Sequence, residues 1–304
     1  NTQIGGNGWG AGTWGRGTWG SGAPVTVANT LRLWAQDNYG EDLIFNVRNG
    51  GVYYWYGDNP TFTRGVTLAS LSTDPETPTK ALQVIVSDRD RHVIALGANY
   101  GGSTEQDPLI IRFSNQEDPF TWTSVPTNTA GDLRLGSGSR IVRGVETKRE
   151  IVVFTDIAAY SLQFVGPPYT FGITQIAAGI NVNGYNSFAT VDDTIYWMGT
   201  SSFYVYAGQT QPLTCPLQDY IFDNYNSSQC DKVFAAVTAE YSEITWFYPS
   251  ANSEENDLYV TYNFADRVWS HGALARTCWI DSGIRQYPLA ASTDNYFYYQ
   301  EFGT

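Results

Sequence analysis

The sequence contains little of what enzymes commonly use for catalysis. Histidine occurs only twice in 304 residues, at His92 and His271, and no Gly-x-Ser-x-Gly nucleophile motif accompanies either one. An HExxH zinc motif, an EF-hand loop, a Walker A motif and a Gly-x-Gly-x-x-Gly that follows a strand are all missing. The sequence therefore predicts no catalytic, metal-binding or cofactor-binding residue, and a protein that is not an enzyme.

Cysteine and long apolar runs are also scarce. Cys215, Cys230 and Cys278 are an odd number at spacings that match no metal site and no disulfide framework. We interpret them as free thiols, which suits assembly in a reducing cytoplasm. No apolar run approaches the ~18 residues of a membrane span. We expect a soluble chain, with further residues before Asn1.

Basic residues are also few compared with acidic residues. The chain has 17 basic against 30 acidic residues, for a formal net charge of -13. Such a molecule repels nucleic-acid phosphates, so it is not expected to grip DNA without sequence preference. The sign of the charge suits the wall of a conduit through which DNA slides.

The residues that are abundant indicate an all-β protein. Aromatics make up 15% of the sequence, and 30 glycines stand beside a single methionine. This profile favours strands joined by glycine turns. Asn49-Gly50-Gly51, Asp192-Asp193 and Asp266 separate paired runs, as hairpin turns would. The clearest strand-like runs are Asp42–Val47, Gly51–Tyr56, Ala81–Val86, His92–Leu96, Leu109–Phe113, Ile151–Phe154, Tyr160–Val165, Thr194–Met198, Phe203–Tyr206, Val233–Val237, Glu243–Tyr248, Asp257–Asn263 and Asn295–Gln300.

An aromatic signature recurs along these runs. It reads VYYWYGD at 52–58, PFTWTSV at 119–125, YSLQFVG at 160–166, FYVYAG at 203–208, DRVWSHG at 266–272 and YFYYQEFG at 296–303. The spacings are irregular but cluster in the range of ~40–50 residues, or somewhat more, that a four-stranded propeller blade occupies. We predict a β-propeller of about six four-stranded blades over 31–304, in preference to an array of β-sandwiches.

One segment has helical rather than strand character. TCPLQDYIFDNY at 214–225 offers Thr214 as a cap, Pro216 near the first turn and apolar residues at helical spacing. The sequence predicts one short amphipathic helix there, packed on the edge of the propeller.

The first 30 residues form a different kind of segment, rich in glycine and tryptophan. Trp9, Trp14 and Trp19 recur every five residues, each flanked by glycine. Glycine at this density opposes a regular helix or a core strand. A flexible linker is one interpretation. We favour an irregular segment over 1–30 whose tryptophans dock on the propeller or on a neighbouring subunit, because exposed indoles are a liability.

Carboxylates and aromatics leave two alternatives open. Asp88 with Asp90, and Glu240 with Glu243, are pairs of the kind that glycosidases use, although surface acids are the default interpretation. The aromatics could stack sugars, as in a lectin-like propeller that binds carbohydrate or a receptor. His271, beside Trp269, is interpreted as a turn histidine packed on an aromatic.

Specific strings resemble one protein family along nearly the whole chain. They are GWGAGTWGRGTWG at 8–20, LRLWAQDNYGEDLIFNVRNGGVYYWYGD at 31–58, IRFSNQEDPFTW at 111–122, EIVVFTDIAAYSLQFVGPP at 150–168, DTIYWMGTSSFYVYAG at 193–208, YVTYNFADRVWSHGALARTCW at 259–279 and YYQEFG at 298–303. In this order they resemble the tail hub or nozzle proteins of short-tailed bacteriophages, the packaged-DNA stabilisation family.

The resemblance implies a structural virion protein without catalytic residues. Such a propeller repeats around a sixfold axis beneath the adaptor ring, as a homo-hexamer assembled in the host cytoplasm. Its central channel retains packaged DNA and then releases it. Its partners would be other tail and adaptor proteins and passing double-stranded DNA, bound without sequence specificity, with no small-molecule substrate. The family continues past YYQEFG, so the propeller at 31–304 is expected to be incomplete at both chain ends.

Overall fold

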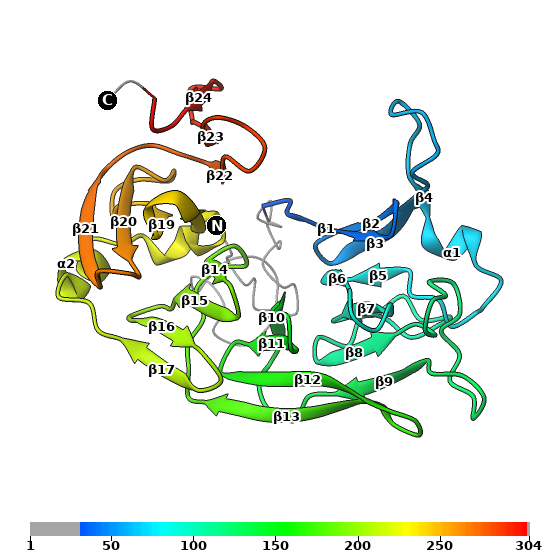
Figure 1. Ribbon diagram of the computed structural model, residues 1–304. Helices are drawn as coiled ribbons and strands as arrows, with labels where there is room; N and C mark the ends of the chain where they lie inside the picture. Colours follow the sequence, from blue (N-terminus) through cyan, green and yellow to red (C-terminus); the bar gives the residue numbers. More distant parts are fainter. Residues whose placement is uncertain (1–30, 303–304) are drawn as a thin grey trace, which may run out of the picture.

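The chain folds into six antiparallel sheets arranged in succession around a centre, which is the predicted six-bladed β-propeller (Figure 1). The computed structural model describes residues 31–302. Each sheet is a meander in which sequence neighbours pair. Four of the six sheets have four strands. Blade 1 gains a fifth short strand, and the described part of blade 6 has three.

The strands fall into blades in chain order. Blade 1 contains β1 (Trp34–Tyr39), β2 (Asp42–Val47), β3 (Gly50–Trp55) and β4 (Val66–Thr67), with β5 (Lys80–Ala81) beside β3; blade 2 contains β6 (Gln83–Val86), β7 (Val93–Leu96), β8 (Ile110–Phe113) and β9 (Gly131–Arg134). Blade 3 contains β10 (Ile141–Glu146), β11 (Ile151–Thr155), β12 (Ala158–Gly166) and β13 (Thr170–Ala178); blade 4 contains β14 (Phe188–Val191), β15 (Thr194–Met198), β16 (Phe203–Tyr206) and β17 (Thr210–Leu213). Blade 5 contains β18 (Phe234–Thr238), β19 (Glu243–Tyr248), β20 (Leu258–Asn263) and β21 (Val268–Ala273); blade 6 contains β22 (Cys278–Ile280), β23 (Leu289–Ala291) and β24 (Phe297–Tyr299).

The first strands of neighbouring blades contact one another and line the centre. β1 lies against β6, β6 against β10, β14 against β18 and β18 against β22. The first strands of neighbouring blades therefore run in the same direction, as the parallel bridge between Asn186 and Phe234 shows. All turns that follow a first strand consequently gather at one mouth of the channel, and all segments that precede a first strand gather at the other.

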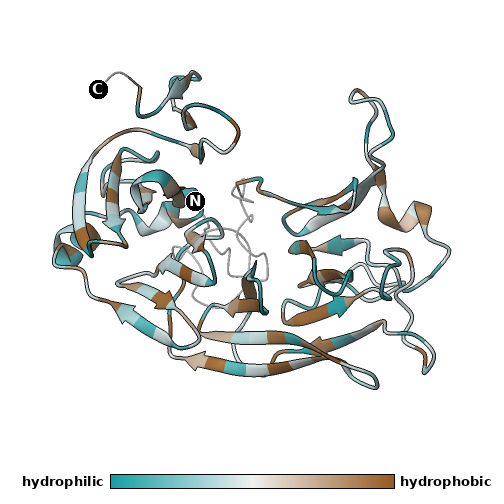
Figure 2. Ribbon diagram, in the orientation of Figure 1, coloured by the Kyte–Doolittle hydropathy of each residue, from teal (hydrophilic) through white to brown (hydrophobic). Residues whose placement is uncertain are grey.

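The hydrophobic core lies between the blades, and strand periodicity explains it. All five residues of β11 are buried. Ile151 and Val153 pack toward blade 2, whereas Val152 and Phe154 pack toward blade 4. Alternate side chains of β11 thus pack into two different hydrophobic cores, one on each face of the blade. Every residue of the 151–154 run is apolar for this reason. Figure 2 shows the hydrophobic residues gathered on the blade strands, with hydrophilic residues frequent in the connections.

Every run that the sequence singled out overlaps a strand, but several strands escaped prediction. The missed ones include β9, β13 and β21, whose burial patterns are partly or mostly exposed. These are the outermost strands of their blades, where one edge and much of a face meet solvent. Without an apolar periodicity they carry no strand signal. They form because the preceding strand offers them a partner.

The turns behave largely as expected. Asn49 and Asp192 have φ angles of 57° and 51°, in the left-handed region that Asn and Asp tolerate. In the β20–β21 turn, the positive φ of 59° falls on Arg267 rather than on Asp266.

The predicted helix is present, but it starts later than expected. α2 (Gln218–Asp223) has Leu217 rather than Thr214 as its N-cap, and it buries Ile221 in the core shared by blades 4 and 5. Three further short helical segments were not predicted: α1 (Leu68–Leu71), η1 (Ser227–Lys232) and η2 (Ala239–Tyr241). Within 31–302, no helix is long and apolar enough to cross a membrane.

Candidate functional site

Buried side-chain amides fix the first strands that line the channel. The Gln83 amide donates to the Gly144 carbonyl at 2.9 Å and accepts from the Gly144 N–H at 2.8 Å, joining blades 2 and 3. Asn46 makes the equivalent connection between blades 1 and 2, because it donates to the Ala81 carbonyl and accepts from Val84. Each amide satisfies backbone groups that would otherwise be buried unpaired.

A cavity of about 670 Å³ opens at the mouth where the first strands begin. It is formed by segments that precede β1, β6, β10, β14 and β18, together with the β2–β3 and β7–β8 connections. Its charged lining residues are Arg32, Arg48, Arg140 and Asp231. Asn49, Gln106, Asn183 and Tyr185 supply further polar groups. We call it the arginine cavity.

An ion pair crosses this mouth. Both guanidinium nitrogens of Arg48 donate to the Asp231 carboxylate, at 2.8 and 2.9 Å, and so connect blade 1 to η1 before blade 5. Burial raises the pKa of Asp231, but the hydrogen bonds from Arg48 and the charges of Arg48 and Arg140 outweigh it, so this pKa lies below its usual range. The carboxylate is therefore ionised at neutral pH and neutralises one arginine.

Asn183 is the least satisfied polar group of the arginine cavity. Its side-chain oxygen accepts a hydrogen bond of 2.7 Å from the Tyr225 hydroxyl. Its amide nitrogen is buried and has no hydrogen-bond partner within the described residues. The residue is only 8% exposed. A buried donor without an acceptor is uncommon in folded proteins.

Carboxylates gather at the opposite end of the propeller, where the first strands end; we call this group of side chains the girdle. At four junctions between blades, a carboxylate accepts a backbone N–H from the neighbouring blade: Asp37 from Val86, Glu146 from Asp88, Asp193 from Lys148 and Asp281 from Ala239. Lys148 and Arg149 add ion pairs to Asp192 and Asp193 at 3.8 and 3.3 Å. The two ends of the propeller thus differ in charge, a separation that sequence patterns do not predict.

Glu146 has the most perturbed acidity in this girdle. Burial, with repulsion from Asp88, Asp37 and Asp90, raises its pKa to about 7 despite its hydrogen bond from the Asp88 N–H. Glu150, four residues later, behaves oppositely. Burial raises its pKa, but hydrogen bonds from Ser161, Tyr206 and Gln163 lower it further, so the net shift is downward. Glu146 therefore titrates near neutrality, and Glu150 stays ionised.

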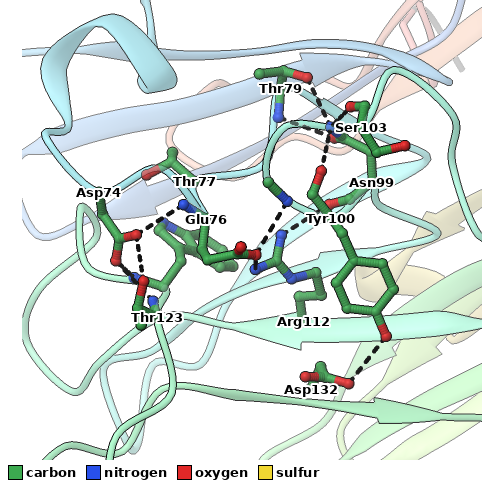
Figure 3. Close-up of polar contacts among 12 residues, drawn as sticks. Asp74, Glu76, Thr77, Thr79, Asn99, Tyr100, Ser103, Arg112, Thr123 and Asp132 are labelled. Carbon is green, nitrogen blue, oxygen red and sulfur yellow. Dashed lines mark hydrogen bonds and ion pairs between the residues drawn. The ribbon is translucent and has the colours of Figure 1, made fainter.

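A polar cluster around Arg112 of β8 is a structural anchor (Figure 3). Its guanidinium lies between the rings of Tyr100 and Trp122, at 5.4 and 6.0 Å from their centroids, and 3.3 Å from Glu76. Asp74 accepts the backbone N–H groups of Trp122 and Thr123, which together with the Thr123 hydroxyl lower its pKa to about 2 against the effect of burial. These contacts tie the β4–β5 connection, which holds Asp74 and Glu76, to β8 and to the β8–β9 connection of blade 2.

The two histidines occupy packing positions. His92 is fully buried and lies edge-on to Phe171 at 5.1 Å between ring centroids, with its Nε2 3.1 Å from the Thr129 hydroxyl. Burial lowers its pKa, so it is neutral at pH 7. His271 packs on an aromatic ring, as predicted, but that ring is Tyr220 of α2, at 4.8 Å between centroids. The prediction that it lies in a turn was wrong, because His271 belongs to strand β21.

The remaining candidate residues are placed as follows. The three cysteines are free thiols, as predicted: Cys215 is buried, Cys230 half-buried and Cys278 exposed. Among the described residues, no group of three or more His, Cys, Asp and Glu side chains could hold a metal ion. The predicted docking residues lie outside the described residues: Trp9, Trp14 and Trp19.

Blade 6 presents an exposed aromatic surface that the sequence did not identify as such. Tyr296, Phe297, Tyr299 and Phe302 are 63 to 77% exposed. Phe302 and Tyr299 lie 6.5 Å apart between ring centroids, and Tyr287 lies 5.2 Å from Phe302. Tyr287, Tyr299 and Phe302 thus form one group of neighbouring rings at the exposed side of blade 6. We call it the blade 6 aromatic surface.

Comparisons with known proteins identify the fold alone. No protein-family model and no curated protein matches the sequence. The extracellular domain of a putative one-component system from B. thetaiotaomicron is similar in structure, with a TM-score of 0.51, 12% identity, and coverage of 90% of this chain and 32% of that one. Hsv2p from Kluyveromyces lactis matches with a TM-score of 0.48 and 11% identity, over 86% of this chain and 70% of that one.

Proposed function

We propose that this chain is a structural propeller of a phage tail hub or nozzle, which forms a ring around the DNA channel and helps to retain and then release packaged DNA. Two observations support the proposal. Sequence strings resembling that family follow one another in order from blade 1 to blade 6. The blade 6 aromatic surface supplies an apolar interface of the kind that a subunit in an assembly needs.

The blade 6 aromatic surface carries this proposal. The protein has a net charge of -13, so copies of it repel one another at long range. Association must then depend on short-range contacts, and aromatic rings bury the most apolar area per side chain. Tyr299 and Phe302, which are 63% and 70% exposed, would provide such contacts to a neighbouring tail subunit. The excess of negative charge would leave passing DNA without adhesive contacts.

Light scattering of the purified chain, alone and with its tail neighbours, tests this role. Replacing Phe297, Tyr299 and Phe302 with serine is expected to leave a folded protein whose association weakens by about a hundredfold or more. The matched control is a pair of exposed aromatics elsewhere, Phe62 and Tyr169, at 87% and 78% exposure, replaced in the same way. Equal association of both variants and the original chain would overturn the proposal.

A carbohydrate- or receptor-binding propeller is the second candidate. The same exposed rings could stack on sugar faces, as aromatic platforms do in lectins. Binding of host glycans on an array, lost in the serine variant and independent of any tail neighbour, would favour this function. A glycoside hydrolase would additionally release sugar from the same glycans, and that turnover would contradict a purely structural role.

A further inference from the structure

Positive charge is concentrated at the arginine cavity against the trend of the whole molecule. Among the residues that the structure describes, its charged lining consists of three arginines and one aspartate. Since Asp231 neutralises Arg48, the charges of Arg32 and Arg140 are left uncompensated within the lining. Both of these side chains belong to exposed residues, and neither takes part in an ion pair among the described residues. In a chain of net charge -13, this concentration requires a reason.

Asn183 independently indicates that the missing partner is a hydrogen-bond acceptor. In the structure the Tyr225 hydroxyl donates to its side-chain oxygen, which leaves the amide nitrogen at the other end of the group. The nitrogen is the atom left without a partner, and the residue lines the arginine cavity. Leaving that donor buried and unpaired costs free energy unless a bound group accepts from it. Guanidinium and amide donors together define the lining of an anion site.

We propose that the arginine cavity binds a phosphate group carried by a small molecule. Two uncompensated positive charges match a phosphate monoester, which carries about -1.5 to -2 charges at pH 7, better than they match a single carboxylate. A guanidinium group can donate two hydrogen bonds to two oxygens of one phosphate, so Arg32 and Arg140 suit this ligand. The cavity volume of about 670 Å³ lies in the range of small-molecule sites.

The chain's own N-terminal segment does not supply this anion. Residues 1–30 contain no Asp or Glu and one Arg. Duplex DNA is also too wide to enter the cavity, because a B-DNA double helix is wider than a small-molecule site. A phosphate monoester, either free or at the end of a single strand, remains as the occupant. This site does not depend on the proposed role in a phage tail.

Isothermal titration calorimetry with the full chain tests the site at constant ionic strength. The probes are inorganic phosphate, a nucleoside monophosphate, and a trinucleotide with or without a 5′-phosphate. We expect saturable binding of the phosphorylated probes and at least about tenfold weaker binding of the trinucleotide that lacks the phosphate. Tighter binding of the monophosphate than of inorganic phosphate would identify a small ester as the ligand, and equal binding would identify free phosphate.

Two substitutions locate the binding within the cavity. Arg140→Gln removes an uncompensated charge, and Asn183→Asp keeps the acceptor for Tyr225 while it repels an anion. Each is expected to weaken phosphate binding by about tenfold or more. Arg89→Gln, an equal charge change at the opposite mouth, is the control and should bind as the original chain does. Thermal melting verifies that each variant is folded. Absence of saturable binding, equal binding with and without the phosphate, or equal binding by all variants would overturn the proposal.

Discussion

Replacing Glu146 with glutamine should stabilise the protein above neutral pH. The folded pKa of about 7 exceeds the ordinary value of 4.5. A carboxyl whose pKa is raised by folding contributes stability that is fully present below pH 4.5 and is lost as the pH rises through 7. The difference between the two pKa values corresponds at most to ~3 kcal/mol at 1.36 kcal/mol for each pKa unit. Because Glu146 is only half-buried, solvent screening reduces the expected effect to about 1–2 kcal/mol. Glutamine removes the charge but keeps an oxygen that accepts the Asp88 N–H.

Urea denaturation at pH 5, 6, 7 and 8 measures this effect. Other groups titrate in the same window, notably His92, whose lowered pKa costs stability as the pH falls. The difference between the variant and the original chain at each pH isolates Glu146 from them. That difference should grow from a few tenths of a kcal/mol at pH 5 to about 1–2 kcal/mol in favour of the variant at pH 8.

Glu150→Gln is the matched comparison, because the same substitution four residues away should have the opposite sign. Hydrogen bonds hold the pKa of Glu150 below its ordinary value, so its stabilising effect is present above pH 4.5 and lost as the pH falls. Its replacement should therefore destabilise the protein at pH 7. The reasoning about burial would be refuted if Glu146→Gln were less stable than the original chain at pH 8, or if both variants shifted alike.

Three further predictions concern other parts of the molecule. Gln83→Ala should lower the free energy of unfolding by about 2 kcal/mol or more, because it leaves the buried Gly144 N–H unpaired; a loss below 0.5 kcal/mol in urea titration would contradict this. A thiol reagent should label the exposed Cys278 well before the buried Cys215, whose pKa burial raises; equal rates by mass spectrometry would contradict the packing. Replacing Trp9, Trp14 and Trp19 with alanine should leave a folded monomer that fails to assemble, if they dock on a neighbouring subunit, or lower the melting temperature, if they dock on the propeller. Unchanged size and melting temperature would show that this segment is a passive linker.

Much of the fold was predictable because strand formation depends on local pattern. The apolar run at 151–154 identifies β11 whatever surrounds it, and Asn49 suits a hairpin turn for reasons confined to its own backbone. The repeat of one aromatic signature for each four-stranded unit then gives the approximate blade number. The outer strands β9 and β13 were missed because few of their residues are buried, so the apolar pattern that indicates a strand is weak.

The sequence by itself determined an acidic, six-bladed all-β chain, because composition, strand periodicity and turn residues act over a few neighbouring positions. Only the tertiary structure decided where charge collects. Arg32 and Arg140 lie more than 100 positions apart, and they meet because the first strands of successive blades point the same way. Likewise Glu146 and Glu150 are chemically identical, and their pKa values move in opposite directions because one is buried among carboxylates and the other receives three hydrogen bonds.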